Sequence, residues 1–262
     1  MFNYLLLILF LAFTTTSCDF APTLDKSILE AQRAIENRDF QKAANINDAI
    51  LSKSFRREIK RKVLFQQGDI YLVHLGNPEV ALTYFQQIYK DESDPYWQVR
   101  SLEKMADVNF YQLKRYEQAA KHYEILSQFK PPLNRHDYYK FQMAKSLMEN
   151  KSYPKAIELF NEIAGDSKNK YQYDAYFQKG LINFYNKKWE TAIEHFKVFI
   201  ANSPSKDYVV QAKFLIANCY ETQEKLREAY NIYYSIIDSY PNIEVIKSRL
   251  KSLFERRQSR KR

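Results

Sequence analysis

Small, aliphatic and aromatic side chains recur at regular intervals along the chain. One alanine marks each recurrence, and successive alanines lie 36 to 38 residues apart. A large ring follows most of them by four residues, and another ring precedes several of them by three. Offsets of −3, 0 and +4 place these side chains on one face of an α-helix. The alanines are Ala43, Ala81, Ala119, Ala156, Ala192 and Ala229, and the rings after them are Phe85, Tyr123, Phe160, Phe196 and Tyr233.

A second small residue lies 12 or 13 positions before each of these alanines. Two helices cross closely only where the side chains are small, because a larger one would force the axes apart at about 1–3 kcal/mol. Glycine inside a helix costs about 0.5–1 kcal/mol, so close approach explains Gly68 and Gly180. The six residues are Ala31, Gly68, Ala106, Ala144, Gly180 and Ala217. The sequence therefore predicts an all-α solenoid of about six stacked helical pairs over residues 25–242.

These segments resemble the tetratricopeptide repeat. Two of them read NKSYPKAIELFNEI around Ala156 and NKKWETAIEHFKVFIANSPS around Ala192. The units are two to four residues longer than the 34 of the family, and the first has Asn47 where the ring is expected. The resemblance implies a right-handed superhelix whose first helices line a concave groove.

The segment that follows the last repeat, residues 243–262, is predicted to be a capping helix with a basic tail. Ile243, Ile246, Leu250 and Leu253 form one apolar stripe that would cover the end of the stack. The final RRQSRKR has no apolar residue and is expected to be a solvated tail.

The resemblance also implies that two columns of first-helix side chains face the groove. An apolar groove suits a partner's helix or an extended hydrophobic segment. The alternative is that the same rings pack between neighbouring first helices. The groove residues are expected to be Phe65, Phe141, Phe177, Phe214, Leu72, Phe110, Met148 and Phe184.

The N-terminal residues 1–17 carry no charged side chain and contain a ten-residue apolar run from Tyr4 to Phe13. A helix that spans a bilayer needs about 20 residues, whereas a run of this length matches the apolar part of a secretory signal peptide. Small polar residues then lead to Cys18, an arrangement that resembles a bacterial lipoprotein signal. The resemblance implies acylation of Cys18 and a lipidated linker over residues 18–24. An uncleaved apolar N-terminus or a buried first helix is the alternative.

The net charge of +9 includes one dense basic run, KSFRREIKRK, from Lys53 to Lys62. If the run is helical, five of its cations share a face: Lys53, Arg56, Arg57, Lys60 and Arg61. Such a face is either simply solvated or attracts anionic lipid headgroups or an acidic partner.

The sequence offers no pattern for catalysis or for cofactor binding. It has no glycine-rich phosphate loop, and its four histidines are scattered without a second ligand at metal-binding spacing. We therefore expect no enzyme activity, no metal, no cofactor and no small-molecule substrate. If Cys18 is acylated, Cys219 has no disulfide partner in the chain and is expected to be a small core residue.

An acylated anchor followed by such repeats resembles two bacterial envelope proteins. They are the tetratricopeptide lipoprotein of the outer-membrane β-barrel assembly machinery and the Tol–Pal-associated coordinator. The resemblance implies a membrane-anchored scaffold that faces the periplasm, favours the outer over the inner membrane, and binds proteins rather than nucleic acid. A pilotin of type IV pili is the alternative. If the N-terminus is not a signal, the chain would be a cytosolic adaptor or an RNA-associated scaffold.

Overall fold

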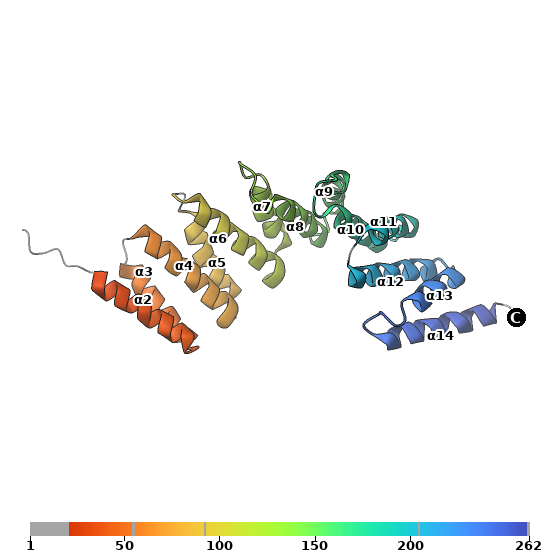
Figure 1. Cartoon of the computed structure of the whole chain (residues 1–262), viewed down its shortest axis with the longest axis horizontal. Coiled ribbons are helices and arrows are strands. Elements are labelled where there is room, and N and C mark those ends of the chain that lie inside the picture. Colours follow the sequence, from red (N-terminus) through yellow and green to blue (C-terminus); the bar gives the residue numbers. More distant parts are fainter. Residues whose placement is uncertain (1–20, 54–55, 92, 204, 261–262) are drawn as a thin grey trace, which may run out of the picture. The chain divides into compact units, whose positions relative to one another are not determined.

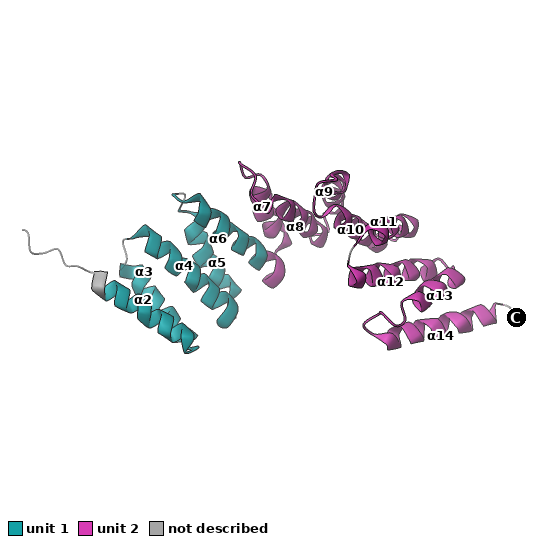
Figure 2. Cartoon of the chain, in the orientation of Figure 1, with its two compact units in different colours: residues 1–108 teal, residues 109–262 magenta. Residues whose placement is uncertain are grey.

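The computed structural model describes residues 21–53, 56–91, 93–203 and 205–260. Within these ranges the chain is all-α, with helices that pack on one another in chain order (Figure 1). It forms two compact units, residues 1–108 and 109–262 (Figure 2). The prediction of an all-α stack of helical pairs is confirmed.

Unit 1 contains two antiparallel helical pairs and one further helix, α6, which packs on α5. α2 pairs with α3, and the continuous segment of α4 and η1 pairs with α5. The elements are α2 (Ala21–Glu36), α3 (Phe40–Lys53), α4 (Arg57–Asp69), the π-helical η1 (Ile70–His74), α5 (Pro78–Tyr89) and α6 (Pro95–Asp107). Since α2 begins at Ala21, residues 21–24 belong to this helix and not to the linker expected over 18–24.

Unit 2 contains three more pairs, with α7 packed on the first and α14 on the last. The pairs are α8 with α9, α10 with α11, and α12 with α13. The helices are α7 (Tyr116–Ser127), α8 (His136–Glu149), α9 (Tyr153–Gly165), α10 (Gln172–Tyr185), α11 (Trp189–Asn202), α12 (Lys206–Thr222), α13 (Leu226–Ser235) and α14 (Ile243–Ser259). A second π-helical segment, η2 (Val108–Gln112), directly follows α6.

One type of turn ends the first helix of each pair. A residue in the left-handed region reverses the chain there, as in the common αL helix cap. Beside it, the amide of Ser152 donates to the carbonyl of Leu147 at 2.8 Å, and that of Lys188 to Asn183 at 2.9 Å. The left-handed residues in the described chain are Arg38, Gly76, Lys114, Lys151, Lys187 and Glu224.

The two π-helical segments explain why the small residues are sometimes 12 and sometimes 13 positions apart. The longer spacing occurs between Gly68 and Ala81 and between Ala106 and Ala119. η1 and η2 lie within these two intervals. A π-helical turn takes up one extra residue, so the first helix absorbs the insertion and the following turn keeps its form.

The paired small residues lie where the helices cross. All six alanines of the second helices are fully buried. A Cβ atom added to Gly68 would lie 2.5 Å from Cε1 of Phe85, and one added to Gly180 would lie 2.5 Å from Cε1 of Phe196. The rings of Phe85 and Phe196 therefore lie directly on Gly68 and Gly180, which confirms the predicted close approach at these two crossings.

The first pair replaces this ring with a polar network. Asn47 is fully buried, and its amide donates to Gln67 at 3.1 Å and to Gln66 at 3.3 Å. Gln67 in turn donates to the carbonyl of Ala44 and to Asp48, both at 3.0 Å. Hydrogen bonds between α3 and α4 thus take the place of aromatic packing in the first repeat.

The last helix caps the stack, but its ends differ from the prediction. Ile246, Leu250 and Leu253 are buried. Ile243 is 40% exposed, so the apolar stripe is one residue shorter than expected. The basic segment after Leu253 is helical as far as Ser259 rather than a solvated tail. Arg256 holds it in place through Glu221 at 3.1 Å and Glu224 at 2.6 Å, both contributed by the C-terminal end of α12 and its turn.

The close crossing makes a specific prediction for Gly180. We expect Gly180→Ala to lower the free energy of unfolding by about 1–3 kcal/mol, because the new methyl group overlaps the ring of Phe196. Gly165→Ala is the matched control, since no heavy atom lies within 4 Å of its Cβ position. Urea denaturation of both variants measures the difference. Equal effects at the two positions would contradict the crossing.

Candidate partner-binding groove

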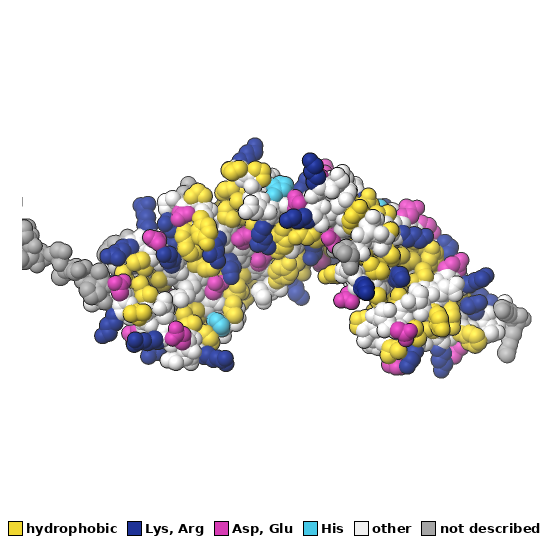
Figure 3. Space-filling view, viewed as in Figure 1, with side chains coloured by type: hydrophobic (Ala, Val, Ile, Leu, Met, Phe, Trp, Pro, Cys, Tyr) yellow, Lys and Arg dark blue, Asp and Glu magenta, His cyan; other side chains and the backbone are white. Residues whose placement is uncertain are grey.

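A cavity of about 490 Å³ lies on the first-helix side of unit 1. Three first helices line it: α2, the segment of α4 and η1, and α6. The lining residues are Ile35, Lys62, Phe65, Gln66, Asp69, Ile70, Val73, His74, Trp97 and Lys104. Apolar side chains and cations alternate over the surface of this unit (Figure 3). We call this cavity the unit 1 groove.

The ring of Phe65 forms the floor of the unit 1 groove. It is only 8% exposed, and its edges contact Phe85 and Trp97, each with ring centroids 5.5 Å apart. The guanidinium of Arg100 lies 4.7 Å from its centroid and the ammonium of Lys104 lies 5.4 Å away. The floor is thus an aromatic surface bordered by two cations.

Carboxylates hold both lysines of the groove. Lys104 pairs with Asp69 at 2.6 Å, and Lys62 pairs with Glu58 at 2.6 Å. The hydrogen bond from Lys62 lowers the pKa of Glu58 below its ordinary value. These pairs leave the walls polar but nearly neutral, so the groove can present its apolar side chains to a partner without a strong field of one sign.

η1 supplies the exposed apolar part of the groove. Within η1, Val73 is 65% exposed. The ring of His74 stacks on Phe40 with centroids 3.7 Å apart, which connects this wall to the first repeat. π-helical turns are frequent at functional sites in proteins, and here the turn coincides with the cavity.

The phenylalanine column predicted to face the groove packs inside the stack instead. Phe177 contacts Phe199 of its partner helix at 5.0 Å and Tyr208 of the next first helix at 6.1 Å. Phe141 stacks on Tyr171 at 4.7 Å and Phe214 on Tyr240 at 4.7 Å. For Phe141, Phe177 and Phe214 this corrects the groove prediction, because an aromatic ring further along the chain covers each of them. Phe65, of this column, also lines the unit 1 groove.

The second predicted column is also largely covered. Phe110 and Met148 are buried, and Leu72 and Phe184 are half-buried. The exposed apolar side chains lie one residue further on, at Val73, Tyr111 and Tyr185, of which Tyr111 is 51% and Tyr185 60% exposed. The sequence analysis missed this third column, although its residues directly follow the positions that it chose.

The basic run does not form one helical face. α3 ends at Lys53 and α4 begins at Arg57, so Lys53 and Arg56 do not belong to the same helix as Lys60. Arg61 also differs from the prediction. Its side chain is only 11% exposed and pairs with Asp91 at 3.1 Å and Asp94 at 3.4 Å.

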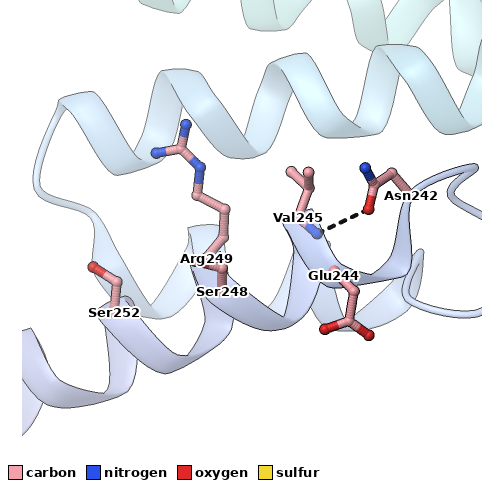
Figure 4. A pocket seen from close by; sticks show the side chains of 6 residues that line it. All are labelled: Asn242, Glu244, Val245, Ser248, Arg249 and Ser252. Carbon is pink, nitrogen blue, oxygen red and sulfur yellow. Dashed lines mark hydrogen bonds between the residues drawn. The ribbon is translucent and has the colours of Figure 1, made fainter.

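A second cavity, of about 540 Å³, lies along α14 (Figure 4). In Figure 4 Arg249 extends toward the neighbouring helix, where it pairs with Glu221 of α12 at 3.5 Å, and Glu244 points away from it. The residues that line this cavity all come from α14 or its N-cap: Asn242, Glu244, Val245, Ser248, Arg249 and Ser252. The unit 1 groove draws on three helices and is the stronger candidate.

Of the two cysteines, the structure describes only Cys219. Cys18 lies outside the described residues. Cys219 is fully buried, and burial raises the pKa of its thiol to about 12, which agrees with the predicted core position. Within the described ranges, no three His, Cys, Asp or Glu side chains gather as metal ligands, and no helix is long and apolar enough to span a membrane.

Comparison with known families agrees with this architecture. Two family models, both described as tetratricopeptide repeat, match the chain, one over residues 141–207 and the other over residues 62–94 and 211–242. The chain contains tetratricopeptide repeats. No curated protein sequence matches it.

Solved structures of tetratricopeptide proteins share the fold at low sequence identity. A tetratricopeptide repeat protein from Parabacteroides merdae is 15% identical, with a TM-score of 0.56 over 89% of this chain and 100% of its own. PilW, described as a widely conserved type IV pilus biogenesis factor, is 11% identical, with a TM-score of 0.56 over 88% of this chain and 98% of its own. The apo form of RapI is 14% identical, with a TM-score of 0.54 over 91% and 87%.

Packing of the phenylalanine column predicts a loss of stability when it is truncated. We expect Phe177→Ala to lower the free energy of unfolding by about 3–5 kcal/mol, because it opens a cavity among three rings. The exposed Tyr185→Ala should change it by less than about 0.5 kcal/mol. Thermal and urea denaturation provide the measurement. A Phe177→Ala protein with unchanged stability would restore the groove interpretation for this residue.

Proposed function

We propose that this protein is a membrane-tethered scaffold that binds a segment of a partner protein in the unit 1 groove. The observation that carries the proposal is the cavity shared by three first helices, with the exposed Val73 on its wall. Stacked helical repeats commonly use such extended inner surfaces for binding, and the fold is typical of interaction scaffolds rather than of enzymes.

The groove suits a short apolar segment of the partner, either helical or extended. Ile35, Ile70 and Val73 offer aliphatic contacts, and a pocket with a few polar groups at its rim fixes the orientation of what enters it. Lys62 and Lys104 are already held by carboxylates, so a partner does not have to neutralise a buried charge.

The tether rests on the sequence around Cys18, which lies outside the described residues. An acylated cysteine would hold the protein at a membrane, because each buried methylene contributes about 0.8 kcal/mol. We place the scaffold in the bacterial envelope, facing the periplasm, with the outer membrane favoured over the inner. There it would assist assembly of outer-membrane proteins or of another envelope complex.

The tether predicts the outcome of metabolic labelling. Cells fed a fatty-acid analogue should label the wild-type chain, and Cys18→Ser should abolish the label and release the protein from the membrane fraction. Cys219→Ser is the matched control and should keep the label, since Cys219 is buried. An unlabelled wild-type chain would favour the alternative of a cytosolic adaptor.

A second candidate function is that of a pilotin for type IV pili. PilW, named as a type IV pilus biogenesis factor, matches 88% of this chain over 98% of its own. A stack of this length therefore suits a pilotin as well as an assembly scaffold. The two candidates differ in what the cell loses without the protein.

Profiling of outer-membrane proteins tests the groove and separates the two candidates. We expect a deletion strain to lose many β-barrel proteins, whereas loss of a secretin multimer alone would favour the pilotin. Val73→Glu should reproduce the deletion, because it places a charge on the apolar wall. Gln86→Glu, on the exposed side of α5 and outside the groove, should restore the wild-type profile. A wild-type outer-membrane profile in the strain with Val73→Glu would contradict partner binding in the unit 1 groove.

A further inference from the structure

Four cations at the junction of α3 and α4 form no ion pair with any carboxylate of the described residues. Lys53, Arg56, Arg57 and Lys60 are exposed, and none of them forms an ion pair within the described part of the chain. The next two cations behave differently, because Arg61 and Lys62 are both paired. Within this basic run, the unpaired charge therefore lies at the end of α3 and the start of α4.

This junction lies at the edge of unit 1 where the chain enters the fold. α2 and α3 are antiparallel, as are α3 and α4, so α4 begins on the same side as α2 (Figure 1). Cys18 precedes the first residue of α2, Ala21, by three residues, which span at most about 11 Å. An acyl chain on Cys18 would therefore tether the chain at the side of unit 1 on which these cations lie.

The loop between α5 and α6 lies beside this junction and adds an aromatic side chain. Arg61 of α4 connects the two, because its guanidinium donates to Asp91 at 3.1 Å and to Ser93 at 2.9 Å. Asp91 carries its own hydrogen bond from Ser93, which lowers its pKa. Tyr96, at the start of α6, is 59% exposed and packs on Trp97. Tyrosine and tryptophan favour the interface between membrane and water.

We propose that this edge of unit 1, formed by Lys53, Arg56, Arg57, Lys60 and Tyr96, docks on anionic phospholipid headgroups. Each cation close to an anionic leaflet strengthens binding about fivefold. Glu58, within the run, is held by Lys62, and Asp91 and Asp94 are held by Arg61, so these carboxylates weaken the attraction little. Docking would add a second attachment to the acyl chain proposed above and would orient unit 1 on the membrane.

Vesicle binding by the full chain tests the proposal, with Cys18→Ser in every variant so that no acyl chain contributes. The apolar run from Tyr4 to Phe13 is common to all variants, so its effect cancels in the comparison. Vesicles contain phosphatidylcholine alone or mixed with phosphatidylglycerol, each at low and at high salt. We expect the chain to bind the anionic vesicles more tightly, and the difference to disappear at high salt.

Two charge-matched triple variants locate the surface. Arg56→Gln/Arg57→Gln/Lys60→Gln should lose about 10-fold or more of the affinity for anionic vesicles. Lys155→Gln/Lys168→Gln/Lys197→Gln removes three exposed, unpaired cations of unit 2 and should bind like the parent. Arg56→Lys/Arg57→Lys/Lys60→Arg keeps the charge and should also bind like the parent, which excludes a folding defect as the cause.

Three results would overturn the proposal. They are equal binding to both kinds of vesicle, an equal loss in the two Gln variants, and unchanged binding of the first Gln variant. An equal loss would mean that the overall charge of +9 attracts the membrane without a defined surface. None of these results depends on acylation of Cys18, so failure of the tether and failure of this surface are distinguishable.

Discussion

The contact between a large ring on one helix and a small residue on the other is the constraint on which the structure depends. Where the small residue is Gly68 or Gly180, the ring of Phe85 or Phe196 occupies the space of the missing methyl group. This distance sets how closely the helices of a pair cross, and the same solution recurs along the chain. The first repeat has Asn47 instead of a ring, and its amide takes part in a hydrogen-bond network that joins α3 to α4 of the next pair.

This packing decides which surface remains for a partner. Phe85, Phe160, Phe196 and Tyr233 of the second helices each contact a phenylalanine of the first helix, and a ring further along the chain then contacts that phenylalanine. The phenylalanine column that the sequence predicts to face the groove is therefore largely covered inside the stack. The candidate binding surface lies at η1, where Val73 is exposed beside a cavity.

The groove and the basic edge are formed by different residues of unit 1, although Tyr96 of the edge packs on Trp97 of the groove. The groove is formed by side chains along the first helices, whereas the unpaired cations gather at the ends of helices where the chain enters. The two proposals can therefore be tested with different variants.

The sequence by itself determined the helical pairs, their period and their crossing points. These features depend on side chains that are neighbours on one helix face or that lie on the two helices of one pair, joined by a short turn. Their spacing along the sequence therefore indicates them directly. The spacing of 13 rather than 12 residues between small residues is visible in the sequence, but only the structure showed that η1 and η2 take up the extra residue.

Tertiary structure alone decided which apolar and charged side chains remain exposed. Phe141 is covered by Tyr171, 30 residues later, and Arg61 is neutralised by Asp91, also 30 residues later. Arg256 is likewise fixed by Glu221, 35 residues earlier. Burial and charge pairing are contributed by the neighbouring repeat, so a pattern read within one repeat cannot contain them.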